Sequence, residues 1–559
     1  MEKIFRIFSR EYGNVNQAAL LLGFFAFLSQ VLALFRDRAM AHFIGPSPTL
    51  DAYYAAFRIP DLIFICIASL ASITVLVPFI VAKMKGDEVT DVARKYLNDI
   101  FTVFLFLMLF VSFVAFILMP YLSNLIAPGF DAEFQDKLVG LSRILLLSPI
   151  LLGLSNLFGT VTQLFRKFFI YALSPIFYNL GIIVGIIFFY PIFDIYGLAI
   201  GVVLGALMHL VVQIISSIQS GFTPGISLSI NFQDIKNVAL TSLPRTLGLA
   251  FNNISLIAII SLASFLKEGS ISVFNFSFNL QSVPLNIIGI SYAVAAFPTL
   301  AKSVSLGQMD EFRNQLKQAA RAIVFWSLPV IFLFIVVRAQ IVRVILGSGA
   351  FSWENTRLVA ACLAIFSISV VAQGIITLLS RAYYANGDTK RPLIVNFSCS
   401  ILIIFLSYGF MYLFENVLFF RYFVESLLKV SDIAGTEVLM LPLAYSVGTI
   451  LNAGLHWYFV RKDFMQGDSF ITKTFFQSLG ASFFLGLVAY IFLNILSPIF
   501  GTTTFWGVFL QGFISGIFGI IAAVIVLYLL GSEELKAVTK TLHTKFWKVK
   551  ILPPAQEEL

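Results

Sequence analysis

Long apolar segments alternate with short polar segments along almost the whole chain. Some fourteen segments are apolar over about 20 residues or more, which is the length that an α-helix needs to cross a bilayer. We expect membrane-spanning helices at residues 16–35, 52–82, 99–126, 138–165, 168–193, 195–218, 237–266, 270–300, 319–337, 357–385, 391–414, 436–460, 470–495 and 505–530. Several exceed the length that a bilayer core requires, so tilted or broken helices are expected. The pattern predicts an all-α polytopic membrane protein with about 14 transmembrane helices.

The composition agrees with this prediction. Hydrophobic residues make up 59% of the 559 residues, charged residues only 12%, and the mean hydropathy is +0.93. A soluble protein of this size has too little core to bury so much apolar surface, so lipid is expected to be the solvent for most of the chain. The cysteines and histidines lack the spacing of a disulfide framework or a metal site, so neither a metal nor a cofactor is predicted. These residues are Cys66, Cys362, Cys399, His42, His209, His456 and His543.

Lysines and arginines are distributed unevenly between the two sets of connecting loops. If the N-terminus is cytoplasmic, 25 of the 37 basic residues fall at the two termini and in the loops of the cytoplasmic side. Cytoplasmic loops of membrane proteins are enriched in lysine and arginine, so both termini are predicted to be cytoplasmic. The net charge of +8 is then a topological signal dispersed through short loops, and it does not indicate nucleic-acid binding.

The chain contains weakly similar segments about 220 residues apart. Residues 77–83 read VPFIVAK at the end of the second predicted span, and residues 297–302 read FPTLAK at the end of the eighth. Such a recurrence predicts two parallel six-helix halves, and transporters built from repeats bind substrate between the halves. The predicted divisions are an N-lobe at 1–222, a C-lobe at 223–465, a C-terminal helix pair at 466–532 and a basic cytoplasmic tail at 533–559.

Several segments resemble one family of membrane proteins. Residues 51–60 read DAYYAAFRIP, residues 126–130 read IAPGF, residues 347–351 read GSGAF, and residues 379–392 read LSRAYYANGDTKRP. In order and spacing these segments are similar to the lipid II flippases called MurJ or MviN, part of the multidrug/oligosaccharidyl-lipid/polysaccharide exporter superfamily. The resemblance runs through most of the first twelve predicted spans.

The resemblance implies a protein of the bacterial cytoplasmic (inner) membrane with fourteen helices in two lobes plus a C-terminal pair. It implies a flippase that moves the lipid-linked peptidoglycan precursor lipid II from the inner to the outer leaflet by alternating access. The expected partners are the lipid-linked sugar diphosphate, membrane lipids and cell-wall synthesis proteins. A transporter rather than an enzyme is expected, with no catalytic residues.

Three positions depart from the family pattern. Family members usually carry arginines where this chain has Gln30, Phe64 and Asn279. A diphosphate entering a low-dielectric cavity needs fixed positive charge, and arginine binds phosphate oxygens with two donors at once. The predicted substrate-binding residues are Arg36, Asp51, Arg58, Arg245 and Asn279. Arg36, Arg58 and Arg245 are expected to neutralise the diphosphate.

Alternatives to lipid II transport remain open at this point. Loss of arginines also suits an exporter of the same architecture for another lipid-linked glycan or a small molecule, and a non-transporting scaffold is a further alternative. A glycosyltransferase is disfavoured because the outer loops are too short to hold paired acidic residues. Asp61 either pairs with Arg58 or responds to protons, and these two hypotheses are left even.

Overall fold

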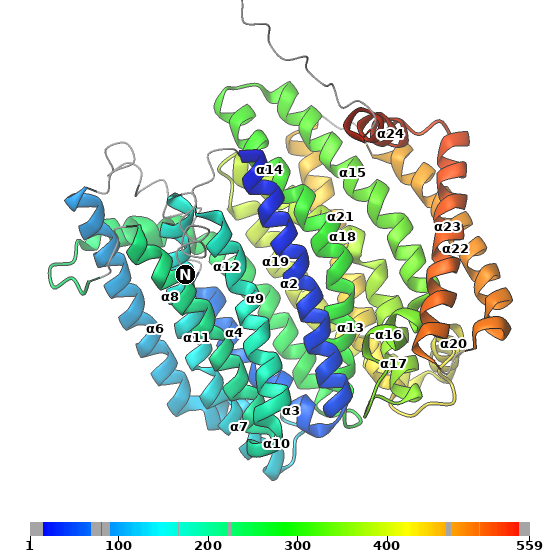
Figure 1. The fold of residues 1–559 in the computed structure, drawn as a ribbon, viewed down its shortest axis with the longest axis horizontal. Coiled ribbons are helices and arrows are strands. Elements are labelled where there is room, and N and C mark those ends of the chain that lie inside the picture. Colours follow the sequence, from blue (N-terminus) through cyan, green and yellow to red (C-terminus); the bar gives the residue numbers. More distant parts are fainter. Residues whose placement is uncertain are drawn as a thin grey trace, which may run out of the picture. The chain divides into compact units, whose positions relative to one another are not determined.

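The structure is a computed structural model that describes residues 15–68, 80, 90–165, 167–220, 225–465, 471–501 and 504–546. Every regular element in these ranges is a helix (Figure 1). Eleven of the described helices or helix runs are long and apolar enough to span a membrane, or twelve if α17 and α18 form one bent span. The all-helical membrane fold is therefore confirmed. The predicted count of about fourteen is not, because α2 (Val15–Phe43) is not among these helices and residues 69–79 and 81–82 of the second predicted span lie outside the described residues.

The chain divides into two compact units, of which the first comprises Met1–Val283, Ile345–Phe366 and Asp388–Asn452. Its elements are α2 (Val15–Phe43), α3 (Pro48–Ala56), α4 (Arg58–Ala68), α6 (Asp91–Ile126), α7 (Ala132–Leu145), α8 (Leu147–Leu164), α9 (Phe168–Val184), the π-helix η1 (Gly185–Phe189), α10 (Tyr190–Phe193), α11 (Ile195–Gln219), α12 (Phe232–Ala263), α13 (Ser270–Pro284), α17 (Trp353–Ile368), α19 (Lys390–Asn416), α20 (Leu418–Leu428), the short 3₁₀ helix η3 (Thr436–Leu439) and the first half of α21 (Met440–Asp463).

The second unit comprises Pro284–Val344, Ser367–Gly387 and Ala453–Leu559. Its elements are the π-helix η2 (Leu285–Ile290), α14 (Ser291–Ser305), α15 (Met309–Val336), most of α16 (Arg338–Leu346), α18 (Val370–Ala385), the second half of α21, α22 (Thr472–Phe500), α23 (Phe505–Leu529) and α24 (Glu533–Phe546). The lobe boundaries expected at residues 222 and 465 stay a prediction.

Polar residues at the ends of apolar runs start several of these helices. The Thr90 hydroxyl accepts a hydrogen bond from the backbone N–H of Ala93 at the start of α6. Asp131 caps α7 in the same way through the N–H of Phe134, and Thr504 caps α23 through Gly507. These caps satisfy N–H groups that have no partner inside the helix, which fixes where each helix begins.

In the first unit α11 packs closely against α9 and η1 through glycines at four-residue spacing. Gly197, Gly201 and Gly205 of α11 face this contact, and a Cβ added to Gly201 would lie 2.4 Å from the Cα of Gly185. Apolar side chains gain nothing by leaving lipid for another helix, so membrane helices associate through close van der Waals packing of small residues. The spacing of the glycines therefore allows the backbone of α11 to approach the backbones of α9 and η1 closely.

We expect Gly201→Ala to lower the free energy of unfolding by about 2 kcal/mol, because the added methyl group overpacks a backbone contact. Gly409→Ala in α19 is the matched control, since nothing lies within 4 Å of its added Cβ. The control is expected to be neutral or stabilising by up to about 1 kcal/mol, because alanine favours the helix. Unfolding in mixed detergent micelles would measure both variants, and equal stability of the two would contradict the packing argument.

In the second unit α14, α15 and α18 form the core. Leu316 and Ile323 of α15 and Leu378 and Leu379 of α18 are fully buried in it. Helices α22 and α23 lie side by side (Figure 1), and the rings of Phe492 and Phe518 stack between them with centroids 4.0 Å apart. The predicted C-terminal pair is thus a helical hairpin.

The described part of the tail after this hairpin forms a helix. In α24 the Glu533 carboxylate accepts a hydrogen bond from Lys473 Nζ at 3.0 Å, and Glu534 accepts one from the Thr474 hydroxyl at 2.5 Å. Both partners lie at the start of α22. The acidic first turn of α24 therefore attaches it to the beginning of the hairpin. Residues 547–559 of the predicted basic tail lie outside the described residues.

The connection after α20 carries a charged pair. Arg357 donates to both carboxylate oxygens of Asp432, at 2.6 and 2.5 Å, and these bonds hold the pKa of Asp432 below its ordinary value. A depressed folded-state pKa stabilises the fold above the ordinary aspartate pKa, and this contribution is lost as the pH falls through the lowered value.

Wild type is therefore expected to unfold at a slightly higher temperature than Asp432→Asn at pH 7. The difference should shrink as the pH falls below about 4, where aspartate becomes protonated in the unfolded chain. It should vanish once the pH lies below the lowered pKa of Asp432 in the folded protein. Thermal unfolding in detergent between pH 3 and 7 would measure this convergence. A difference that is constant with pH would show that the charge of Asp432 has no part in it.

Candidate functional site

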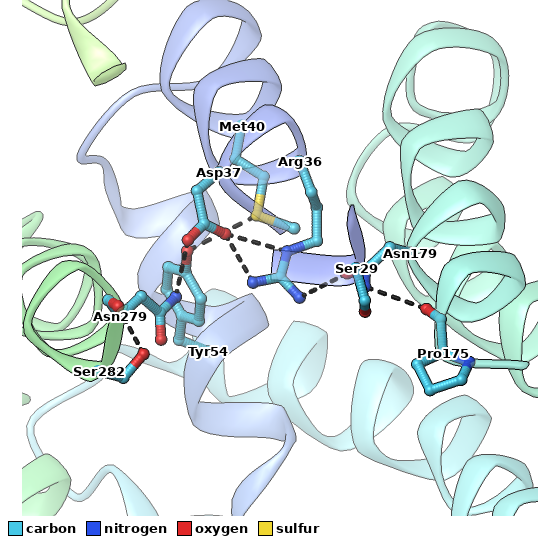
Figure 2. A network of polar contacts seen from close by, with 9 residues as sticks. All are labelled: Ser29, Arg36, Asp37, Met40, Tyr54, Pro175, Asn179, Asn279 and Ser282. Carbon is cyan, nitrogen blue, oxygen red and sulfur yellow. Dashed lines mark hydrogen bonds and ion pairs between the residues drawn. The ribbon is translucent and has the colours of Figure 1, made fainter. Parts of the chain in front are cut away.

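Arg36 and Asp37 near the end of α2 form the centre of a polar network in the first unit (Figure 2). The Nε and one terminal nitrogen of Arg36 donate to Asp37 Oδ1 at 2.9 and 2.7 Å. The Asp37 side chain is only 3% exposed and that of Arg36 is 21% exposed. A carboxylate buried inside the protein in this way needs a paired cation and further hydrogen-bond donors.

Two asparagines from other helices complete the network. Asn179 of α9 accepts a hydrogen bond from Arg36 at 3.3 Å, and Asn279 of α13 donates to Asp37 Oδ2 at 3.1 Å (Figure 2). The Asn179 amide nitrogen in turn lies 3.3 Å from Ser29 Oγ and 3.1 Å from the Pro175 carbonyl oxygen. Three helices are thus joined through one buried ion pair. Asn279, predicted to bind substrate, contacts Asp37.

Asp51 of α3 lies at the first turn of α13. Its carboxylate accepts hydrogen bonds from the backbone N–H groups of Gly269 and Ser272, both at 2.7 Å, and from the Ser272 hydroxyl at 2.5 Å. Asp51 is 4% exposed. The negative charge therefore caps the N-terminus of α13, where N–H groups without helical partners and the helix dipole favour an anion. These contacts assign Asp51 a structural task, and its predicted role in substrate binding stays a prediction.

Arg58, the first residue of α4, lies against the same helix. One of its terminal nitrogens donates to Asn275 Oδ1 at 2.7 Å, and the Asn275 amide donates to the Ile271 carbonyl at 2.8 Å. The buried Nε of Arg58 has no hydrogen-bond partner in the part of the chain that the structure describes. A buried donor without a partner is costly, so Arg58 retains capacity to bind an acceptor.

The remaining predicted site residue is Arg245. Its backbone belongs to α12, but its side chain lies outside the described residues. The structure therefore brings Arg36 and Asn279 into one network, places Asp51 and Arg58 against the first half of α13, and describes no contact of Arg245. Whether any of these residues binds substrate stays a prediction.

Asn179 is the member of this network that the sequence reasoning missed. It stands in a strongly apolar helix, one turn after Pro175, and a polar amide in such a helix indicates a partner inside the bundle. That signal identifies Asn179 as unusual, but it does not name Arg36 as the partner. Arg38, the next residue of α2, donates a hydrogen bond to the Ile345 carbonyl oxygen at 3.1 Å.

Close backbone contacts join the helix connections around Asp51. A Cβ on Gly129, between α6 and α7, would lie 2.3 Å from the Ser264 carbonyl oxygen at the end of α12. A Cβ on Gly349 would lie 2.2 Å from the His42 carbonyl oxygen, which accepts a hydrogen bond from Ala350 at 2.9 Å. At both positions only glycine permits this approach. One end of the first unit is therefore held together backbone to backbone.

Comparison with known proteins places this fold and sequence in a family. The family model "Lipid II flippase MurJ" matches residues 40–511. The "Probable lipid II flippase MurJ" of Rhizobium tropici is 28% identical over 373 residues, covering 65% of this chain and 70% of that protein. The "Lipid II flippase MurJ" of Burkholderia cenocepacia is 25% identical over 399 residues, covering 70% and 77%.

Solved structures agree in fold. A chain titled "Lipid II flippase MurJ, inward closed conformation" matches with a TM-score of 0.69 at 20% identity, over 93% of this chain and all of that one. An inward-facing multidrug resistance MATE family transporter of the MOP superfamily matches with a TM-score of 0.63 at 15% identity, over 78% and 95%. At these identities the likeness establishes the fold alone. The match of the family model over most of the chain goes further, and on that ground the protein belongs to the MurJ lipid II flippase family.

Proposed function

We propose that this protein is a flippase that moves lipid II from the inner to the outer leaflet of the bacterial cytoplasmic membrane by alternating access. Membership of the family and the many helices able to span a membrane support this function. The structural observation that carries most weight is the buried network of Arg36, Asp37, Asn179 and Asn279. It joins helices of both predicted six-helix halves by charged groups, which membrane interiors tolerate chiefly where they function.

The charges around each arginine suggest the order in which the arginines contact the diphosphate. Asp37 balances the charge of Arg36, so this pair contributes little net attraction for a diphosphate. Among the described residues the buried Nε of Arg58 has no hydrogen-bond partner, its other hydrogen bond goes to a neutral amide, and the Asp61 carboxylate interacts with it only through its charge. We therefore propose that Arg58, with Arg245, meets the diphosphate first, and that Arg36 contributes as its contact with Asp37 loosens.

The contacts around Asp51 support a closed outer end. The charge distribution predicts that the connections containing Gly45, Gly129, Gly269 and Gly349 face outward, with both termini cytoplasmic. Hydrogen bonds from α13 to Asp51, with the glycine contacts, hold these connections together. Release of cargo to the outer leaflet would have to break them. Rocking of two rigid halves is the common way to do this in transporters with repeated halves.

A second candidate function is export of another lipid-linked glycan by the same fold. What favours it is that Gln30, Phe64 and Asn279 are uncharged, whereas the resemblance to the family implies arginines at these positions. A cargo with a smaller negative charge would need fewer arginines, because each buried charge must be compensated.

Rescue of a bacterium depleted of its own lipid II flippase tests the proposal. Wild type is expected to restore growth, and Arg58→Ala is expected to lose most of this activity. Arg58→Lys keeps the charge without the planar fork of donors, and it should rescue partly. Arg357→Ala is the control, because Arg357 binds Asp432 in a connection away from the network. Membrane insertion is confirmed for each protein. Failure of the inserted wild-type protein to rescue would reject lipid II as cargo.

Binding separates the two candidate functions. Purified protein in detergent is titrated with lipid II and with a lipid-linked oligosaccharide that carries a single phosphate. Tighter binding of lipid II, weakened by Arg58→Ala, is the expected result. Preference for the singly charged lipid would favour the second function.

A further inference from the structure

Helix α20 presents a row of apolar side chains to its surroundings. Its sequence LFFRYFVESLL begins at Leu418, and five of its large side chains are well exposed: Leu418 63%, Phe419 81%, Tyr422 62%, Phe423 56% and Leu427 66%. The last four lie one, four, five and nine residues after Leu418, and this spacing places all five along one side of an α-helix. An exposed apolar stripe of this kind marks an interaction surface.

The opposite side of α20 is fixed to the protein. Glu425 is 3% exposed and accepts hydrogen bonds from Arg421 Nε at 3.1 Å and from the Thr436 hydroxyl at 2.7 Å. The Arg421 guanidinium also lies 5.4 Å from the ring centroid of Phe414 in α19. Breaking this arrangement would leave the Glu425 charge buried without a partner. The helix therefore cannot turn to bury its apolar stripe against its own chain.

The stripe continues a surface that already faces lipid. Helix α19 is long and apolar enough to span a membrane, and its outward side chains include Phe405, Tyr408 and Tyr412, which are 70%, 58% and 67% exposed. Helix α20 begins two residues after α19 ends at Asn416. The Phe410 and Phe420 rings of the two helices stack with centroids 6.3 Å apart. The aromatic stripe of α20 thus lies where a membrane-spanning helix leaves the bilayer.

We propose that α20 is an interfacial helix whose Phe419, Tyr422 and Phe423 side chains lie among the lipid headgroups and upper acyl chains. Aromatic residues favour this depth, and interfacial helices bury their apolar side about 5–10 Å into the boundary region. The only charged residues of α20 are Arg421 and Glu425, which pair with each other. Binding therefore rests on apolar burial and does not require anionic lipid. This inference needs only a membrane-spanning α19 and does not depend on the cargo.

Fluorescence quenching in vesicles tests the proposal on the full-length protein. A fluorophore is attached to Phe419→Cys and the protein is reconstituted in phosphatidylcholine. Quenching by lipids with a nitroxide near the headgroup is compared with quenching by aqueous iodide. Phe405→Cys in α19 is the lipid-facing control, and Ser431→Cys is the control in the exposed connection. Labelling of the wild type measures the background from Cys66, Cys362 and Cys399, of which the last two are buried.

The expected result is severalfold stronger quenching of the Phe419→Cys label than of the Ser431→Cys label by the shallow nitroxide lipid, with protection from iodide. The same pattern is expected in vesicles containing phosphatidylglycerol. Strong iodide quenching without lipid quenching would overturn the proposal. So would protection from both quenchers, which would indicate that protein covers the stripe, or a requirement for anionic lipid. Tyr422→Cys repeats the test one turn along the same side if the first variant folds poorly.

Discussion

Replacing Arg36 with alanine is expected to lower the free energy of unfolding by about 3 kcal/mol, the loss typical when one partner of a buried ion pair is removed. The reason is Asp37, which is 3% exposed and, among the described residues, would keep only the Asn279 amide as a hydrogen-bond partner. Transport should be lost with it. Detergent-titrated unfolding measures the first effect, and rescue of a flippase-depleted strain measures the second.

A variant in which both members of the ion pair are neutral separates the effect on stability from the effect on substrate binding. In the double variant Arg36→Gln with Asp37→Asn, no charge is left buried, so stability should recover most of the loss. If Arg36 also neutralises the diphosphate, this stable double variant will still fail to transport. Full transport by the double variant would show that the pair is structural only. A single Arg36→Ala variant as stable as wild type would contradict the buried-pair argument itself.

Replacing Asp51 with alanine is the second large effect that we expect, again a loss of about 3 kcal/mol, because two backbone N–H groups and one hydroxyl lose a charged acceptor in a buried place. These donors are the backbone N–H groups of Gly269 and Ser272 and the hydroxyl of Ser272. The first turn of α13 would then fray. Hydrogen exchange across residues 269–276, together with unfolding, is the measurement.

Two further variants form a graded series with it. Asp51→Asn keeps one acceptor oxygen and should lose less stability. Ser272→Ala removes only the hydroxyl bond and should cost about 1 kcal/mol, the net worth of one ordinary hydrogen bond. If Asp51 binds substrate as well, Asp51→Asn will lose more transport than its stability explains. Equal stability of Asp51→Ala and Ser272→Ala would rule out the cap as the main contribution of the carboxylate.

Much of the architecture was predictable from the sequence because the insertion of a helix into a membrane depends mainly on the residues of that helix. Twelve of the fourteen predicted spans, from 99–126 to 505–530, correspond to the candidate spans of the structure, including the bent α17 and α18. Each span depends on the summed hydropathy of neighbouring residues, which requires no knowledge of the rest of the fold. Residues 16–35 form part of the helix α2, although this helix is not among the candidate spans.

The partners of the polar residues were not predictable in this way. Arg36 and Asp37 are neighbours in sequence, but the residues alone predicted that Arg36 neutralises a diphosphate, and they did not predict that Asp37 balances its charge. Asn179 and Asn279 lie 143 and 242 positions from their partners in this network. The Asp51 carboxylate reaches N–H groups 218 and 221 positions away. No local pattern specifies which of several buried amides or helix starts a given charge will meet.

The sequence by itself therefore determined that this protein is a helical membrane protein of a known family, and it marked the charged residues that interrupt apolar helices. Only the tertiary structure decided that Asp37 balances Arg36, that Asp51 caps α13, and that the Arg58 Nε has no hydrogen-bond partner within the described ranges. The physical reason is the difference in range of the two kinds of interaction. Transfer into lipid is a sum over adjacent residues, whereas a buried polar group must find its partner through the packing of the whole unit.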